Sequence, residues 1–311
     1  MHEIKGNEAG IPQGDRPTAV ALGFFDGVHR GHQAIIGQAL QAAKEQGLVS
    51  VVHTFQVAPK ILLGRASNGI QITSIEEKLD ILENMGVQYV VEDDLNPIYR
   101  AMSPVEFVDK VLVERLGAKM VSAGFHYHFG QYGAGNAQML EELCAQRGIQ
   151  CHITQRIASG QETISSTAIR GLLERGDIEK ANDLLGRRYF VLAEVVRGKQ
   201  LGRKLGFPTI NQNIKENSIV LHKGVYITRV LVDGVWHLGV TNVGRRPSVD
   251  GAGRENIETF IFDFHGDLYG RTLKVEFVRH LRDEKRFATL EQLQQQIEID
   301  KMAARAWEAQ S

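Results

Sequence analysis

The chain has little cysteine and no long apolar run, and each of these absences excludes a class of protein. Cys144 and Cys151 are its two cysteines and form no CxxC pair, so we expect no disulfide framework. No apolar run approaches the roughly 18 residues that a spanning helix needs. The N-terminal stretch also lacks the basic start and apolar core of a signal peptide. We therefore expect a cytoplasmic protein without a membrane partner.

The chain also lacks a large charge of either sign, since its formal net charge is −1. Residues 1–184 carry 16 basic and 22 acidic side chains, whereas residues 185–311 carry 20 basic and 15 acidic ones. The basic residues of the second part are scattered rather than gathered on one helix. This distribution argues against nucleic acid as a partner and favours a pocket for phosphorylated small molecules. Nothing in the sequence indicates an oligomeric state.

The first part of the chain alternates short apolar strands with helices. Repeated βα units predict an α/β domain with a doubly wound parallel sheet, whose ligands bind beyond the carboxyl ends of the strands. Helices are expected to begin near His29, Ser74 and Ser103, the last two with capping boxes, and another to cover 136–147. The expected strands are 18–23, 49–54, 88–91, 119–123 and 150–154.

The second part has the rhythm of short antiparallel strands, with Asp233-Gly234 as a hairpin turn. Such strands favour a small closed β-barrel. A final helix over 290–307 has Leu293, Ile297, Met302 and Ala306 on its expected apolar side. We place the domain boundary between residues 1–185 and 186–311. The expected strands are 189–196, 224–232, 235–242, 258–264 and 272–281.

The most informative motif is the turn Gly23-Phe24-Phe25-Asp26-Gly27-Val28-His29-Arg30-Gly31-His32, between an apolar strand and a helix. A glycine-rich turn at a helix start presents backbone N–H groups to an anion. Two histidines three residues apart lie on one helix face, so both can donate to one phosphate. A zinc site is the alternative, but no third ligand follows at a suitable spacing. The motif predicts a nucleotide site with chemistry at phosphorus.

Two further segments of the first part could converge on the same nucleotide. Ser165, Ser166, Thr167 and Arg170 place hydroxyls and a guanidinium at a helix start, which suits the outer phosphates of a triphosphate, although the hydroxyls could only cap the helix. The loop 124–130 is rich in aromatic residues and could sandwich a ring. Its His126 and His128 could equally be structural.

The segment 202–211 carries a second constellation of glycines, cations and oxygen-bearing side chains. Its glycines and Lys204 can wrap a phosphate chain, and Thr209 and Asn211 offer the oxygen ligands that Mg²⁺ prefers. The P-loop pattern GxxxxGK[ST] is absent, which excludes ordinary Walker-type binding. Glu258 begins an apolar and aromatic run, where it could act as a general base or be a solvated edge residue.

The motifs of the first part resemble a known group of enzymes. GxFDxxHxGH together with SSTxIR is similar to the cytidylyl/adenylyl-transferase group, and residues 172–189 resemble the junction of bacterial bifunctional riboflavin kinase/FAD synthetases. The resemblance implies that His29 and His32 stabilise the transition state of adenylyl transfer. It implies flavin binding by His126. The implied ATP-binding residues are Gly23, Phe25, Asp26, Gly31, Ser165, Ser166, Thr167 and Arg170.

The motifs of the second part resemble the flavokinase signature. Gly202–Asn211 is similar to GxxLGFPTAN, with Ile210 in place of the customary Ala. The resemblance implies that Glu258 takes the proton from the ribityl 5′-hydroxyl, and that Thr209 and Asn211 hold Mg²⁺. It further implies ATP binding by Lys204, Gly206, Thr209 and Asn211, and flavin binding by Phe207, Arg282 and Phe287.

Together the resemblances imply a Rossmann-like nucleotidyltransferase domain followed by a flavokinase barrel with a C-terminal helix. Such an enzyme phosphorylates riboflavin to FMN with ATP, then adenylylates FMN to FAD and releases pyrophosphate. Three departures lie in the first part: Val57-Ala58-Pro59 stands where the family commonly has Pro-His-Pro, His126 replaces a usual Asp or Asn, and His128 stands where Arg is common. A kinase with an impaired adenylyltransferase domain and a flavin-sensing, nucleic-acid-binding regulator are the alternatives.

Overall fold

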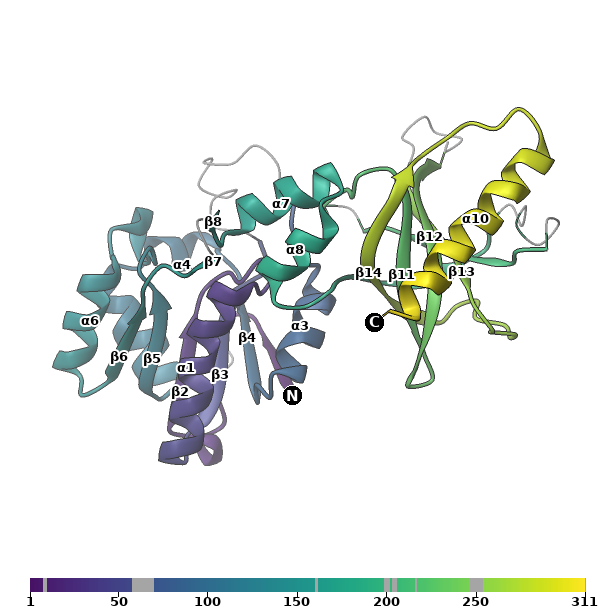
Figure 1. Ribbon diagram of the computed structural model, residues 1–311. Coiled ribbons are helices and arrows are strands. Elements are labelled where there is room, and N and C mark those ends of the chain that lie inside the picture. The colour runs from purple at the N-terminus through teal and green to yellow at the C-terminus, as the bar shows by residue number, and fades with distance from the viewer. Residues whose placement is uncertain are drawn as a thin grey trace. The chain divides into compact units, whose positions relative to one another are not determined.

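The chain forms two compact units, Met1–Ser166 and Thr167–Ser311 (Figure 1). The computed structural model describes residues 1–7, 10–57, 70–159, 162–198, 202, 206–215, 217–246 and 254–310, with backbone alone at 158–159, 162, 245–246 and 254–255. The boundary expected between residues 185 and 186 remains a prediction.

The first unit is built on a six-stranded parallel sheet, in the order β1-β4-β3-β2-β5-β6. This arrangement confirms the predicted doubly wound sheet. The strand at the N-terminus, which pairs with β4, was not expected, because its four residues have no apolar pattern. The strands are β1 (His2–Lys5), β2 (Thr18–Leu22), β3 (Val49–Phe55), β4 (Tyr89–Asp93), β5 (Ala118–Gly124) and β6 (Gln150–Thr154).

Helices connect these strands, and α1 contacts four of them, β2, β3, β5 and β6. Both predicted capping boxes are present, Ser74 with Glu77 and Ser103 with Glu106. The elements are α1 (Arg30–Gln46), α3 (Ile75–Asn84), α4 (Pro97–Ala101), α5 (Pro104–Glu106), a π-helical segment (Phe107–Arg115), α6 (Ala137–Gln146), two 3₁₀ turns (Gln13–Asp15 and Gln131–Gly133) and the short strands β7 (Ala158–Ser159) and β8 (Glu162–Thr163).

The strand order places the predicted nucleotide motifs at one point of the sheet. β2 lies between β3 and β5, so the order of the strands reverses at β2. In open α/β sheets ligands bind at such a switch point, beyond the carboxyl ends of the strands. The histidine turn follows β2 and the aromatic loop 124–130 follows β5. Parallel pairing therefore brings together two motifs that are far apart in sequence.

The second unit is a closed six-stranded barrel in the order β10-β13-β12-β11-β14-β9, which confirms the predicted small closed barrel. The strand β10 was not among the expected strands. Asp233 and Gly234 form the predicted tight turn between β11 and β12, with φ of 49° and 79°. The strands β12 and β14 end later than expected, and β13 begins earlier than expected. The elements are α7 (Ser166–Arg175), α8 (Ile178–Leu185), β9 (Tyr189–Val196), β10 (Thr209–Asn213), β11 (Gly224–Val232), β12 (Val235–Arg246), β13 (Arg254–Ile261), β14 (Thr272–Asp283) and α10 (Leu290–Glu308).

The apolar side expected for α10 was partly wrong. Leu293 and Ile297 are half-buried, but Met302 is 63% exposed and Ala306 is also exposed. The buried side chains of this helix are instead Asp300 and Ala304. A buried carboxylate is tolerated where it has a charged partner, and this pairing can be seen only once the helix is packed on the barrel.

Candidate active sites

The histidine turn is held in a strained backbone conformation at the end of β2. Phe25 and Val28 have positive φ, 56° and 39°, which side-chain-bearing residues rarely adopt. His29 caps α1, because its Nδ1 accepts a hydrogen bond from the backbone N–H of His32 at 3.3 Å. Its Nε2 therefore carries the proton in the neutral ring. The two imidazole rings stack with their centroids 3.6 Å apart. Both histidines therefore lie on one face of the helix start, as their spacing predicts.

His32 has the electrostatics of a group that acts by hydrogen bonding rather than by charge. Burial lowers its pKa well below 6.5, and the charges of His29, Lys78 and His126 lower it further. Its Nδ1 is shielded from solvent and has no hydrogen-bond partner among the described residues. A buried polar atom without a partner is costly unless something completes it. This pattern is typical of a ligand-binding position.

Several other residues of the motif build the turn itself. The Phe25 ring is 1% exposed and lies over Gly23, where a Cβ would approach its Cζ to 2.8 Å. Asp26 is buried, and its Oδ1 accepts a hydrogen bond from the backbone N–H of Ile72 at 2.8 Å. The hydroxyl of Ser166 donates to the backbone carbonyl of Asp26 at 3.0 Å, which attaches the Ser-Ser-Thr segment to the turn. Binding of ATP by these residues stays a prediction.

Lys78 on α3 is a residue that the sequence did not single out. Its ammonium donates to the backbone carbonyl of Phe24 at 2.8 Å and to the hydroxyl of Thr54 at 3.3 Å. Burial lowers its pKa to about 8, although the charges of Asp26 and Glu92 oppose this. In an acidic helical stretch a lysine is expected to be exposed, so no local signal could have found it.

The remaining predicted parts of the first site are the aromatic loop 124–130 and the segment 57–59, where the sequence differs from the family pattern. His126 is exposed, and a Cβ at Gly124 would lie 3.5 Å from its Cε1. Val57 is 37% exposed, while Ala58 and Pro59 lie outside the described residues. No third histidine, cysteine or carboxylate joins His29 and His32 at ligand distance within the described ranges.

The second site occupies one face of the barrel. β10 and β13 pair so that Asn211 faces Glu258 and Thr209 faces Phe260. Alternation along a strand puts these four side chains on one face of the sheet. Glu258 is half-buried, and β13 has a partner on both sides, β10 and β12. The structure thus excludes the alternative of a residue on an exposed sheet edge.

Asn256 links the predicted residues of this face and was also missed. Its amide donates to Asn211 Oδ1 at 3.3 Å and to Glu258 Oε1 at 3.4 Å. Its own Oδ1 is buried without a hydrogen-bond partner among the described residues. The clue available in the sequence is its position two residues before Glu258, on the same strand face.

Glycines allow the segment before β10 to approach this face closely. A Cβ at Gly198 would lie 2.5 Å from Asn211 Nδ2, and one at Gly202 would lie 3.2 Å from Thr209 Oγ1. Gly206 has φ of 84°, which favours glycine. Lys204 lies outside the described residues.

The flavin-binding residues predicted for the barrel lie beside α10. Arg282 is fixed by Asp300, with Nε 3.0 Å from Oδ1 and one terminal nitrogen 2.8 Å from Oδ2. The guanidinium also lies 5.9 Å from the Phe287 ring centre. Phe207 lines a surface hollow of ≈ 610 Å³ with Gln294, Gln295, Glu298 and Ile299. Asp300 is a third residue that the sequence did not single out.

Comparisons with known proteins agree with this division of chemistry. The family model for FAD synthetase matches residues 11–168, and that for riboflavin kinase matches residues 185–308. A bifunctional riboflavin kinase/FMN adenylyltransferase of Bacillus subtilis is 36% identical over 94% of this chain and 93% of its own length. The protein of the same name from Pseudomonas fluorescens is 36% identical over 95% of this chain and 94% of its own length.

A solved structure from Streptococcus pneumoniae, described as a macrolide-efflux protein, has a TM-score of 0.86 and 29% identity. It covers 99% of this chain and 100% of its own. In the part of this chain that the structure describes, no helix is both long and apolar enough to cross a membrane. The two consecutive family matches, and relatives that align over nearly the whole chain, show which family this chain belongs to. It belongs to the bifunctional riboflavin kinase/FMN adenylyltransferase family.

Proposed function

We propose that this chain makes FAD from riboflavin in two steps, in the cytoplasm. The barrel transfers the γ-phosphoryl group of ATP to riboflavin, giving FMN and ADP. The parallel-sheet domain transfers AMP from a second ATP to the phosphate of FMN and releases pyrophosphate. The observation that carries the proposal is that both family matches occur in one chain, at residues 11–168 and 185–308. The two free cysteines suit a reducing compartment.

In the adenylylating site, His29 and His32 donate hydrogen bonds to the reacting phosphates. The FMN phosphate oxygen attacks the α-phosphorus of ATP, and the charge that develops there needs donors already in position. The stacked imidazoles and the N-terminus of α1 provide such donors without reorganisation. Ser165, Arg170 and the backbone N–H of Ser166 bind the outer phosphates, which leave as pyrophosphate, because the hydroxyl of Ser166 already donates to Asp26.

In the kinase site, Glu258 accepts the proton of the ribityl 5′-hydroxyl as that oxygen attacks the γ-phosphorus of ATP. Its hydrogen bond with Asn256 orients the carboxylate. Thr209 and Asn211 offer a hydroxyl and an amide oxygen on the same face, a donor set that suits Mg²⁺. When bound, Mg²⁺ would neutralise phosphate charge during transfer. Arg282, Phe207 and Phe287 contact the flavin.

One incubation tests the proposal against its alternatives. The full chain is incubated with riboflavin and MgATP, and riboflavin, FMN and FAD are then separated by chromatography. We expect FMN followed by FAD. FMN alone would establish a kinase with an impaired first domain, and no product would overturn the enzyme assignment. The names of the matched relatives, which include both activities, favour the two-step result.

Replacing Asp300 with Asn is expected to raise the KM for riboflavin about tenfold, with a smaller effect on kcat. The change removes the charge that fixes Arg282, and a lost charge-assisted hydrogen bond costs about 1.5–3 kcal/mol. Kinase kinetics measure the effect. Adenylylation of supplied FMN should not change, and Glu308→Gln, an exposed carboxylate on the same helix, is the control. An unaltered KM in folded D300N protein would refute this role.

A further inference from the structure

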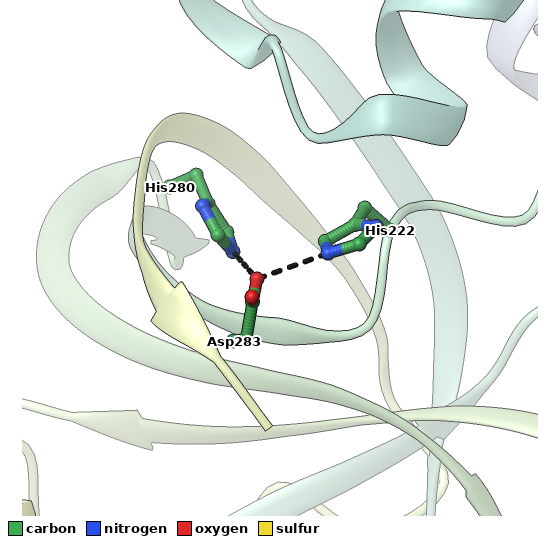
Figure 2. Close-up of side chains that lie close together, drawn as sticks. All are labelled: His222, His280 and Asp283. Atoms are coloured by element: carbon green, nitrogen blue, oxygen red, sulfur yellow. Dashed lines mark hydrogen bonds and ion pairs between the residues drawn. The ribbon is translucent and has the colours of Figure 1, made fainter. Parts of the chain in front are cut away.

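Two histidines and one carboxylate meet at the end of β14, at a place that the proposed function does not use. His222 lies in the segment that leads into β11, and His280 and Asp283 lie on β14. Figure 2 shows the Asp283 carboxylate between the two imidazole rings. Its Oδ1 is 3.0 Å from His222 Nε2 and 3.6 Å from His280 Nε2. Three potential ligand atoms, one from each residue, lie within 4.8 Å of one another.

A β-bulge brings His280 and Asp283 onto the same face of β14. Residues three apart on a regular strand point to opposite faces. Here Gly224 pairs with Asp283 and Tyr226 with His280, so the register shifts by one residue between them. Bulges re-aim side chains in this way and often mark functional positions. Arg282 pairs with Val225 and therefore faces the other side, so the cluster is separate from the proposed flavin site.

The two histidines are held in position before any ligand binds. The hydroxyl of Tyr226 donates to the backbone carbonyl of His222 at 2.5 Å, and the Tyr226 ring packs on that of His280 with centroids 4.9 Å apart. The backbone N–H of His222 donates to the carbonyl of Leu173 at 3.1 Å. A Cβ at Gly224 would lie 2.6 Å from His280 Nε2, so any larger residue at position 224 would clash with this nitrogen. Preorganised ligands of this kind favour metal binding.

The donor atoms have the chemistry of a transition-metal site. His280 Nε2 is shielded from solvent and lacks a hydrogen-bond partner among the described residues. Ligands on a tetrahedral Zn²⁺ lie about 3.3 Å apart for bonds of about 2.0 Å, close to the two distances observed.

We propose that His222, His280 and Asp283 bind one divalent transition-metal ion of the Zn²⁺ class. Two imidazoles and one carboxylate suit Zn²⁺, Co²⁺ or Fe²⁺ better than Mg²⁺, which prefers oxygen ligands alone. The Asp283 side chain is 74% exposed, so water completes the coordination from the solvent side. The ion connects the end of β14 to the segment entering β11. The site is independent of the proposed function.

Co²⁺ is the probe, because its visible absorption reports nitrogen and oxygen ligands directly. Untagged full-length chain, stripped with a chelator, is titrated with Co²⁺ in the absence of nucleotide, and bound metal is counted by equilibrium dialysis. We expect one equivalent with a tetrahedral or five-coordinate spectrum. H280Q and D283N should weaken this binding by about tenfold or more. H265Q, which changes an exposed histidine of the same barrel, should bind as the parent does.

Thermal unfolding gives a second readout and tests whether the variants fold. Zn²⁺ should raise the Tm of the parent and of H265Q by several degrees, because a ligand that binds only the folded chain stabilises it. D283N changes a side chain that is mostly exposed and should melt like the metal-free parent. The same Co²⁺ stoichiometry and spectrum in parent, H280Q and D283N would place the ion elsewhere and overturn the proposal. Absence of bound Co²⁺ in the parent would also overturn it.

Discussion

Replacing Glu258 with Gln is expected to abolish FMN formation while adenylylation of supplied FMN continues. A general base contributes about 10²–10⁴-fold to a rate, and Gln keeps the shape of the side chain but cannot accept the proton. Glu258 lies inside β13 opposite Asn211, so the amide should still fit beside Asn256. The measurement follows both reactions of the same preparation, with riboflavin or FMN as the starting flavin.

The control for this variant is E194Q, which removes an exposed carboxylate from β9 of the same barrel and should retain full kinase activity. Because FMN adenylylation depends on the other domain, its survival in E258Q shows that the loss is confined to the barrel, and a parental thermal unfolding transition shows that the barrel itself has folded. Kinase activity within about tenfold of the parent would contradict a role for Glu258 as general base.

Replacing His32 with Ala is expected to lower the rate of FMN adenylylation by about 10²–10³-fold, the usual cost of one preorganised donor. The kinase step should be unaffected. The imidazole stacks on His29 and carries a buried nitrogen without a partner, so its removal takes away a donor and also loosens the other ring. Pyrophosphate release from ATP and FMN measures the rate.

H152Q is the matched control, since His152 is an exposed histidine on β6 of the same unit. Partial recovery in H32N, whose amide can still donate, would assign the loss to hydrogen bonding rather than to packing. Formation of FAD from supplied FMN by H32A at the parental rate would contradict the proposed role of His32.

Patterns within short stretches of sequence predicted much of the fold. The capping boxes at Ser74 and Ser103 and the Asp233-Gly234 turn depend on neighbouring residues, and the structure contains all three. The apolar side of α10 could not be predicted correctly in the same way. Asp300 is buried because Arg282, on another element, neutralises it, and Met302 consequently lies on the exposed side.

The candidate sites likewise contain residues that local sequence predicts and residues that only contacts between distant segments reveal. The histidine turn, Thr209, Asn211 and Glu258 were found from motifs whose chemistry lies in a few consecutive residues. Lys78, Asn256 and Asp300 were not, because each gains its role from a partner on another segment or across the strand pairing.

The sequence by itself determined the two-domain order and the fold classes through local periodicity, and the pair of reactions through the resemblance of its contiguous motifs to a known family. Only the tertiary structure decided where the nucleotide motifs meet, at the point where the order of the parallel strands reverses beside β2. It also decided the cluster of His222, His280 and Asp283, because a bulge in β14 overrides the alternation that the sequence predicts. The physical reason is that strand pairing joins residues by register, and register is a property of the folded sheet.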